Sequence, residues 1–204
     1  MKPFTSLTAV AAPFDMANID TDKIIPARFL RKLRSMSQGY EPYLFHDMRF
    51  DEKGLIRPEF ILNQSPYQDS GVIVAAANFG CGSSREGAVY ALMDWGIRAV
   101  IAPSFGDIHY ANEIQNGMLP AILEEKYCAV LRQNLLNQPG GLVSINLVDQ
   151  SITGPQGEHY SFEIEPVYKD RLLKGLDDVG LVLEALAHIE AFEAQHFAKR
   201  PWLT

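Results

Sequence analysis

The chain has 204 residues and a formal net charge of -7, and 47% of its residues are hydrophobic. This length is enough to bury a substantial core, and we expect one domain over residues 1–204. The acidic balance argues against a nucleic-acid partner. No apolar stretch is long enough to span a membrane and no secretory signal begins the chain, so we expect a cytoplasmic protein with no membrane partner.

The first distinctive segment is NIDTDKIIP at residues 18–26. Asp20 and Asp22 alternate there as they would along an extended segment, which would point both carboxylates to one side. Two interpretations stay open: the carboxylates serve turns and caps, or one of them orients His109 or an active-site arginine while Thr21 contacts a substrate. Two carboxylates without further ligands nearby do not predict a metal site.

The middle of the chain predicts two strand-and-helix units. Residues around 35–39 are polar and irregular, and residues 40–70, rich in aromatics, prolines and charges, are expected to form an excursion on the surface. Apolar runs are then followed by segments with apolar side chains at helical spacing, which is typical of strands of a parallel sheet alternating with helices. The two units are residues 72–77 into 85–95, and residues 99–102 into 105–116.

The C-terminal third continues the mixed pattern. Further strands are expected at residues 142–148 and 160–164, around a GPQG turn at residues 154–157. An alanine-rich helical stretch follows, from residue 178 to about residue 199. Periodicity alone therefore predicts a mixed α/β chain.

The most informative segment is NFGCGSSRE at residues 78–86, where a strand gives way to a helix N-terminus. Unpaired N–H groups and the helix dipole favour a negatively charged ligand at such a position. Arg85 adds a planar group that can bind a carboxylate through two parallel hydrogen bonds. Gly80 and Gly82 allow positive φ or a close approach of the backbone. The segment therefore predicts a site for a carboxylate or a phosphate.

The serines of this segment have two interpretations. In the first, Ser83 is the N-cap of a capping box and Glu86, three residues later, reaches back to the backbone. In the second, Ser83 or Ser84 acts on a substrate held by Arg85. A phosphate-binding loop of the Walker type is absent, because no lysine follows the glycine and an arginine follows the two serines instead.

Residues 78–88, NFGCGSSREGA, resemble the signature of the small, swivelling domain of the aconitase superfamily, and in particular the small subunits of 3-isopropylmalate dehydratases. Three further segments agree with that family in order and spacing, so the resemblance spans nearly the whole chain. It implies a swivelling β/β/α domain, an α/β fold with a mixed sheet and flanking helices. The three segments are residues 18–26, 103–120 and 175–181.

The resemblance implies a hydro-lyase of leucine biosynthesis, a branched-chain amino-acid pathway, that isomerises 2-isopropylmalate to 3-isopropylmalate by dehydration and rehydration. It assigns the catalytic base to Ser83, which needs N–H groups and an arginine nearby to stabilise its alkoxide. We expect Arg85 to bind a carboxylate of the dicarboxylate substrate, supported by Ser84, Gly82 and the local backbone N–H groups.

Phe29, Leu30 and Arg31 lie where the family's loop contacts the variable group of the substrate. The apolar pair would suit an isopropyl or methyl group and Arg31 an extra carboxylate, or the two apolar residues simply anchor the loop to the core. One residue departs from the family, which usually has His where this chain has Gly87. That departure leaves open a paralogue acting on a methyl-substituted malate or maleate.

The cysteine content limits which cofactor the chain can hold. Cys81 and Cys128 are the only cysteines and have no metal-ligand spacing, whereas an iron–sulfur cluster needs three or four thiolates. The superfamily's enzymes use a [4Fe–4S] cluster, which implies that a separate large subunit carries it as a Lewis acid and that the active enzyme is a heterodimer. We expect Cys81 near the substrate and Cys128 buried. The alternative class is a non-catalytic anion-binding module.

Overall fold

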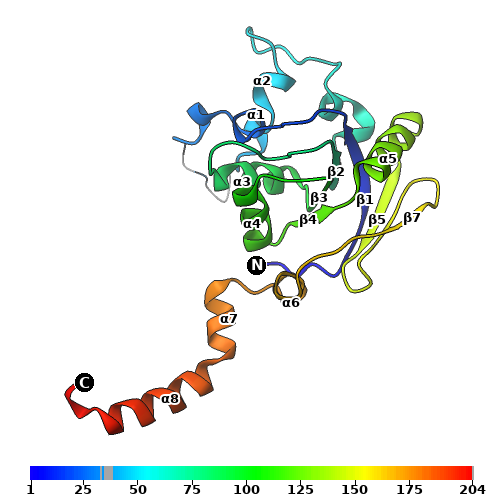
Figure 1. Ribbon diagram of the computed structural model, residues 1–204. Coiled ribbons are helices and arrows are strands. Elements are labelled where there is room, and N and C mark those ends of the chain that lie inside the picture. Colours follow the sequence, from blue (N-terminus) through cyan, green and yellow to red (C-terminus); the bar gives the residue numbers. More distant parts are fainter. Residues whose placement is uncertain (33, 35–38, 204) are drawn as a thin grey trace.

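The computed structural model describes residues 1–32, 34 and 39–203, so most of the segment predicted to be irregular around residues 35–39 lies outside the described residues (Figure 1). The described strands are β1 (Ser6–Phe14), β2 (Val72–Ala75), β3 (Ala99–Ala102), β4 (Leu119–Ile122), β5 (Leu142–Asn146), β6 (Ser151–Thr153) and β7 (His159–Ser161). They form one sheet in the order β4-β3-β2-β1-β5-β6-β7.

Helices of very different lengths connect and follow these strands. The α-helices are α1 (Thr21–Ile24), α2 (His46–Arg49), α3 (Glu86–Trp95), α4 (Asp107–Asn116), α5 (Glu125–Asn137), α6 (Pro166–Lys174), α7 (Asp178–Glu184) and α8 (Leu186–Lys199). Single 3-10 turns are η1 (Ala27–Phe29), η2 (Glu41–Tyr43), η3 (Ile61–Asn63), η4 (Ser65–Tyr67) and η5 (Pro201–Leu203).

The sheet is mixed. Strands β1, β2, β3 and β4 run parallel to one another, with Ala11 beside Val72 and Val72 beside Ala99. Strands β5, β6 and β7 continue from β1 in antiparallel pairing. The predicted mixed sheet with flanking helices is therefore confirmed, and the predicted strand at residues 99–102 has the observed bounds.

Both faces of the parallel half are covered, which is why β2 and β3 are apolar at every position. Side chains alternate between the two faces, as the period of a strand requires. One face packs against α3 and the segment of residues 40–67, and the other against α5 and α6. The first face carries Ala12, Phe14, Ile73, Ala75, Val100 and Ala102, and the second carries Ala11, Val72, Val74, Ala99, Ile101, Leu119 and Ala121.

The segment of residues 40–70 is only in part the surface excursion that its composition predicts: residues 52–59 are exposed, but the flanking residues reach the core. Leu44 and Phe45 are fully buried, Leu62 is also fully buried, and Tyr67 is 2% exposed. The Tyr67 hydroxyl donates to the Leu135 carbonyl oxygen at 3.1 Å, which ties this segment to α5. Aromatic side chains on short irregular turns thus complete one core beneath the sheet.

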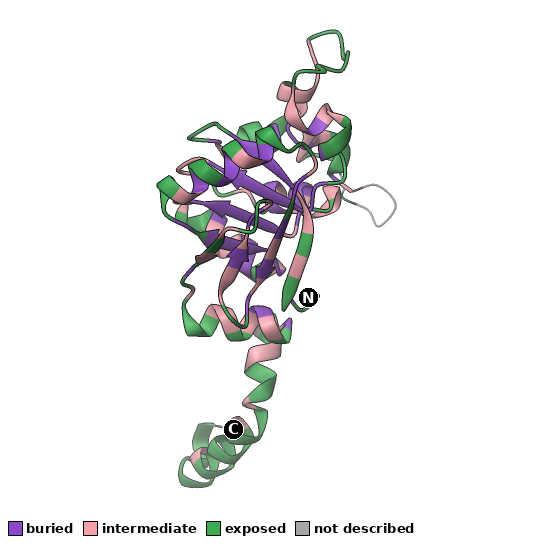
Figure 2. Ribbon diagram, turned by 90° about the vertical axis from the view of Figure 1, so that its right-hand side faces the viewer, coloured by how far each residue is buried: buried purple, intermediate pink, exposed green. Residues whose placement is uncertain are grey.

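Helices α7 and α8 form an arm that leaves the body of the molecule (Figure 1, orange to red). The predicted helical stretch from residue 178 to about residue 199 is confirmed, with a break at Ala185. Helix α8 contributes no buried residue, and the arm is mostly exposed in Figure 2, in contrast to the buried strands. No helix in the described part of the chain combines the length and apolar content needed to cross a bilayer.

The arm is expected to add little to the stability of the body. A chain that ends after Asp177 keeps the contact of the Met1 ammonium with the Gly175 carbonyl oxygen at 2.9 Å, and loses mainly exposed contacts. Its free energy of unfolding in urea should fall by about 1 kcal/mol or less. Leu172→Ala, which removes a fully buried side chain, should cost about 2–5 kcal/mol in the same assay. Equal losses in the two variants would contradict the prediction that the arm adds little to the stability of the body.

Candidate active site

Three loops meet where the parallel strands end. They follow β1, β2 and β3, and parallel strands bring their carboxyl ends to the same edge of a sheet. The Asn78 side-chain amide donates to the Asn18 side-chain oxygen at 2.7 Å, and the Gly80 amide donates to the Ile19 carbonyl oxygen at 2.7 Å. Residues 18 and 78 both adopt positive φ, which asparagine tolerates better than most residues. The first two loops are thus fixed to each other.

Thr21 fixes the loop of residues 78–85, called the serine loop below, through two hydrogen bonds. Its side chain is buried, its amide donates to the Cys81 carbonyl oxygen at 3.0 Å and its hydroxyl donates to the Ser83 carbonyl oxygen at 2.9 Å. Asp20, the residue before, is the N-cap of α1 and accepts the Lys23 amide at 2.8 Å. The expected extended conformation is therefore wrong, because residues 21–24 form a helical turn. For Asp20 the capping interpretation is correct.

Asp22 instead forms an ion pair with Arg85. The hydrogen bond from Arg85 lowers the pKa of the Asp22 carboxyl, and a hydrogen bond from the Ala27 amide at 3.2 Å acts in the same direction. Only 17% of the Arg85 side chain is exposed, against 56% for Asp22. The alternative in which one carboxylate of the motif orients an active-site arginine therefore matches the position of Asp22.

The capping box predicted for Ser83 and Glu86 is wrong. Helix α3 begins at Glu86 with Arg85 as its N-cap, and no side chain caps that end. The Glu86 carboxylate instead accepts a hydrogen bond from the Asn116 side chain at 3.0 Å. Ser83 and Ser84 are exposed. Because the first N–H groups of α3 receive no side-chain cap, this helix end retains the capacity to bind an anion.

A buried histidine–glutamate pair supports the serine loop from α4. His109 Nε2 lies 3.0 Å from Glu113 Oε1, and both side chains are at most 1% exposed. Burial raises the pKa of Glu113, against an opposing effect of its contact with His109. Gly80 lies so close to the His109 ring that a Cβ would stand 2.2 Å from it. Glu113 was not predicted, although its spacing of four residues after His109 on a helix was a usable signal.

These elements enclose a pocket of about 220 Å³. It contains five of the predicted site residues, and the N-terminus of α4 forms the opposite wall. Four other predicted site residues belong to the same two segments but do not line the pocket: Asp20, Asp22, Cys81 and Ser84. The lining residues are Thr21, Gly80, Gly82, Ser83, Arg85, Gly106, Asp107, Ile108 and His109.

The predicted substrate loop lies apart from this pocket. The Phe29 ring stacks on the Tyr43 ring at 4.4 Å, and both Phe29 and Leu30 pack against the core. This packing matches the interpretation in which the two residues anchor the loop. Arg31 is exposed and lines a separate hollow with Ala27 and Arg28.

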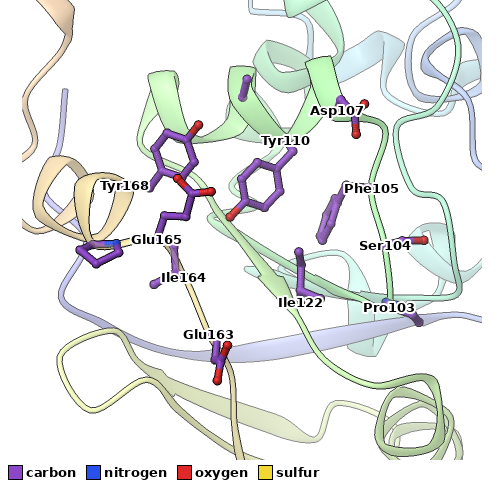
Figure 3. A pocket seen from close by; sticks show the side chains of 12 residues that line it. Pro103, Ser104, Phe105, Asp107, Tyr110, Ile122, Glu163, Ile164, Glu165 and Tyr168 are labelled. Carbon is purple, nitrogen blue, oxygen red and sulfur yellow. The ribbon is translucent and has the colours of Figure 1, made fainter.

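A larger hollow of about 770 Å³ adjoins the pocket and shares Asp107 with it (Figure 3). Glu163 and Glu165 also line it, as do the rings of Tyr110 and Tyr168, whose centroids are 6.0 Å apart. The larger hollow adds two carboxylates to the shared Asp107 and has no Lys or Arg among its described lining residues, so it would repel a dicarboxylate, whereas the smaller pocket has Arg85. The smaller pocket is therefore the better site for an anionic substrate.

Comparison with known proteins identifies the family of this chain. The sequence profile of the aconitase C-terminal domain matches residues 1–139. This chain belongs to the aconitase C-terminal domain family. A second profile, LeuD_N, matches residues 129–166.

Full-length relatives narrow the family further. The chain is 47% identical to the 3-isopropylmalate dehydratase small subunits of Dinoroseobacter shibae and of a Jannaschia species, with 100% of each chain covered. The crystal structure of 3-isopropylmalate dehydratase from Methanocaldococcus jannaschii is similar, with a TM-score of 0.65, 28% identity, and coverage of 92% of this chain and 99% of that one. The resemblance read from the four motifs, and the α/β fold it implies, are confirmed.

The family's iron–sulfur cluster does not fit the donors of this chain. Among the described residues, no three His, Cys, Asp or Glu side chains are grouped as a metal would require. Cys128 is buried, as predicted, and its thiol donates to the Leu123 carbonyl oxygen at 3.2 Å. Burial raises the pKa of Cys128 to about 12, so it does not provide a thiolate near neutral pH.

The two thiols are therefore expected to differ in reactivity. At pH 8 the partly exposed Cys81 should react with a disulfide reagent, whereas Cys128 should react only after unfolding, because it stays protonated below about pH 12. Counting released thiolate with and without denaturant checks this, and Cys81→Ala should remove the native signal. Two reactive thiols in the folded chain would contradict it.

Gly80 provides a test of the loop's packing. Gly80→Ala places a Cβ 2.2 Å from the His109 ring and also imposes positive φ on alanine. Gly157→Ala is a matched control, because it has positive φ with nothing within 4 Å. The control should cost about 1–2 kcal/mol of unfolding free energy. Gly80→Ala should cost about 1–3 kcal/mol more in urea unfolding. Equal costs would mean that the His109 contact is unimportant.

Proposed function

We propose that this chain is the small subunit of a hydro-lyase that isomerises 2-isopropylmalate to 3-isopropylmalate in leucine biosynthesis. A large subunit would complete the heterodimer and hold the [4Fe–4S] cluster. The observation that supports this function most is the pocket lined by Ser83 and by Arg85, the N-cap residue of α3, whose N-terminus has no side-chain cap. The full-length similarity to small subunits of that name supports the choice of reaction.

Arg85 and the N-terminus of α3 would bind a carboxylate of the substrate. The arginine is held by Asp22, so its guanidinium is already oriented before the substrate arrives. The first N–H groups of α3 provide additional donors with the positive end of the helix dipole. Ser84 is beside them and exposed, and we assign it a supporting contact.

Ser83 would act as the base that removes a proton from the carbon next to the carboxylate. The proton would move to Ser83 Oγ as the hydroxyl leaves the neighbouring carbon as hydroxide. In rehydration, hydroxide would add to the carbon that lost the proton, and Ser83 Oγ–H would give a proton to the carbon that lost the hydroxyl. A serine alkoxide needs fixed donors around it and little water. Gly82, with positive φ, and the bond from Thr21 to the Ser83 carbonyl oxygen fix the loop for this role.

The exposure of the serines explains why the chain would act only in a complex. Ser83 and Ser84 are both exposed in the isolated chain, where bulk water would weaken the attraction of Arg85 and the N–H groups for an alkoxide and would protonate it. A large subunit that covers this edge of the sheet would exclude that water.

We further propose that residues 1–204 act as one domain in the cytoplasm. We also propose that the chain has no nucleic-acid partner, which the net charge of -7 supports.

The direct test is anaerobic reconstitution. The chain is mixed with its cluster-loaded large subunit, and 2-isopropylmalate and 2-methylmalate are compared as substrates. We expect higher kcat/KM with 2-isopropylmalate, formation of 3-isopropylmalate, and no turnover by either subunit alone. Preference for 2-methylmalate would indicate a paralogue with another substrate, and no turnover with either acid would refute the proposed reaction.

Ser83→Ala tests the base in the reconstituted complex. Loss of a general base should lower kcat by about 100-fold to 10,000-fold, with a smaller change in KM. Ser84→Ala is the neighbouring control and should mainly raise KM, because its hydroxyl would support binding. Binding of the large subunit, measured by calorimetry, should be unchanged in both variants. A Ser83→Ala complex with normal kcat would exclude the proposed base.

A further inference from the structure

Gly87 occupies a position where glycine is unfavourable for the backbone. It is the second residue of α3, and its φ lies outside the left-handed region. In a helix interior glycine costs about 1 kcal/mol relative to alanine. The reason for glycine here is space: an added Cβ would lie 2.4 Å from Leu30 Cδ2 and 3.6 Å from Tyr40 Cε2. Leu30 therefore rests directly on the first turn of α3.

Leu30 belongs to a segment, residues 27–32, that is fixed at several other points. Phe29 stacks on Tyr43, and the Tyr40 hydroxyl donates to the Lys32 carbonyl oxygen at 3.0 Å. Phe29, Leu30 and Tyr43 all pack against the core. A side chain at position 87 would meet the end of the Leu30 side chain, which would have to turn or move away from α3 within this packed segment.

The start of the same segment is connected through Asp22 to Arg85, the candidate substrate-binding arginine. The Ala27 amide donates to Asp22 Oδ1 at 3.2 Å, and Asp22 forms the ion pair with Arg85. Arg85 in turn lies two residues before Gly87 at the N-terminus of α3. The contacts thus form a closed ring from Gly87 through Leu30, Ala27 and Asp22 to Arg85.

We propose that Gly87 is a positioning residue for the substrate: by having no side chain, it lets the segment of residues 27–32 seat on α3 and so holds Asp22 and Arg85 in place. Gly87 itself contacts no reacting atom in this scheme. The inference rests on the proposed function for its effect on catalysis, whereas the ring of contacts is a property of this chain alone.

A double-mutant cycle in the reconstituted complex tests the catalytic effect. Gly87→Ala should raise the KM for 2-isopropylmalate about tenfold and change kcat less, since a displacement of about 1 Å can cost up to about 100-fold. Adding Leu30→Ala should remove the obstruction, so the double variant should recover most of the loss and the two changes should be strongly non-additive. Gly180→Ala, at another helical glycine on α7, is the matched control and should leave both constants unchanged.

A second measurement needs no turnover. In the isolated chain, the hydrogen bond from Arg85 holds the pKa of Asp22 below its ordinary value, and NMR can follow the titration of this carboxyl. Gly87→Ala should raise that pKa toward the ordinary value by loosening the pair. The double variant should lower it again, and Gly180→Ala should not change it.

The outcomes separate the two claims. An inactive wild-type complex with the expected shift in the Asp22 titration would refute the proposed function and support the ring of contacts. An active wild-type complex in which Gly87→Ala changes neither KM nor the Asp22 titration would overturn this inference. Equal effects with and without Leu30→Ala would overturn it as well, because the obstruction would then not be Leu30.

Discussion

The parallel alignment of β1, β2 and β3 is the constraint on which the candidate site depends. The residues that follow these strands are far apart in sequence, and the shared direction of the strands brings them to one edge of the sheet. Short hydrogen bonds then join the loops, such as the bond between the side chains of Asn78 and Asn18. Each strand is buried on both faces, so the edge is held by the whole core.

Much of this arrangement could be predicted from the sequence. The apolar runs of β2 and β3 are continuous because both faces are buried, and such runs are an easily read signal. The loop at residues 78–86 was recognisable because glycines, serines and an arginine between a strand and a helix have few other uses. The resemblance to a known family then assigned roles that spacing alone could not. Those roles for Ser83, Ser84 and Arg85 remain predictions.

The parts that were missed have physical reasons. Strand β1 contains three alanines and a proline, and its partners β2 and β5 are distant in sequence, so pairing rather than local pattern defines it. The segment of residues 40–67 buries Phe45 and Tyr67 on irregular turns, which have no periodicity to detect. The S-x-x-E pattern predicted a cap at Ser83, but the loop places Arg85 at the N-cap instead.

The ion pair between Asp22 and Arg85 has a further consequence for recognition. The arginine already has an internal carboxylate partner, so in the proposed site a substrate carboxylate would meet a cation that is partly neutralised. The substrate carboxylate would have to share the five N–H donors of the guanidinium with Asp22 or displace Asp22 from them. The free energy of substrate binding would then reflect the difference between the contact of the substrate with Arg85 and the contact of Asp22 with Arg85 that it weakens or replaces. Such a site would discriminate against small anions, because only a ligand with additional contacts could compete with Asp22 for the arginine.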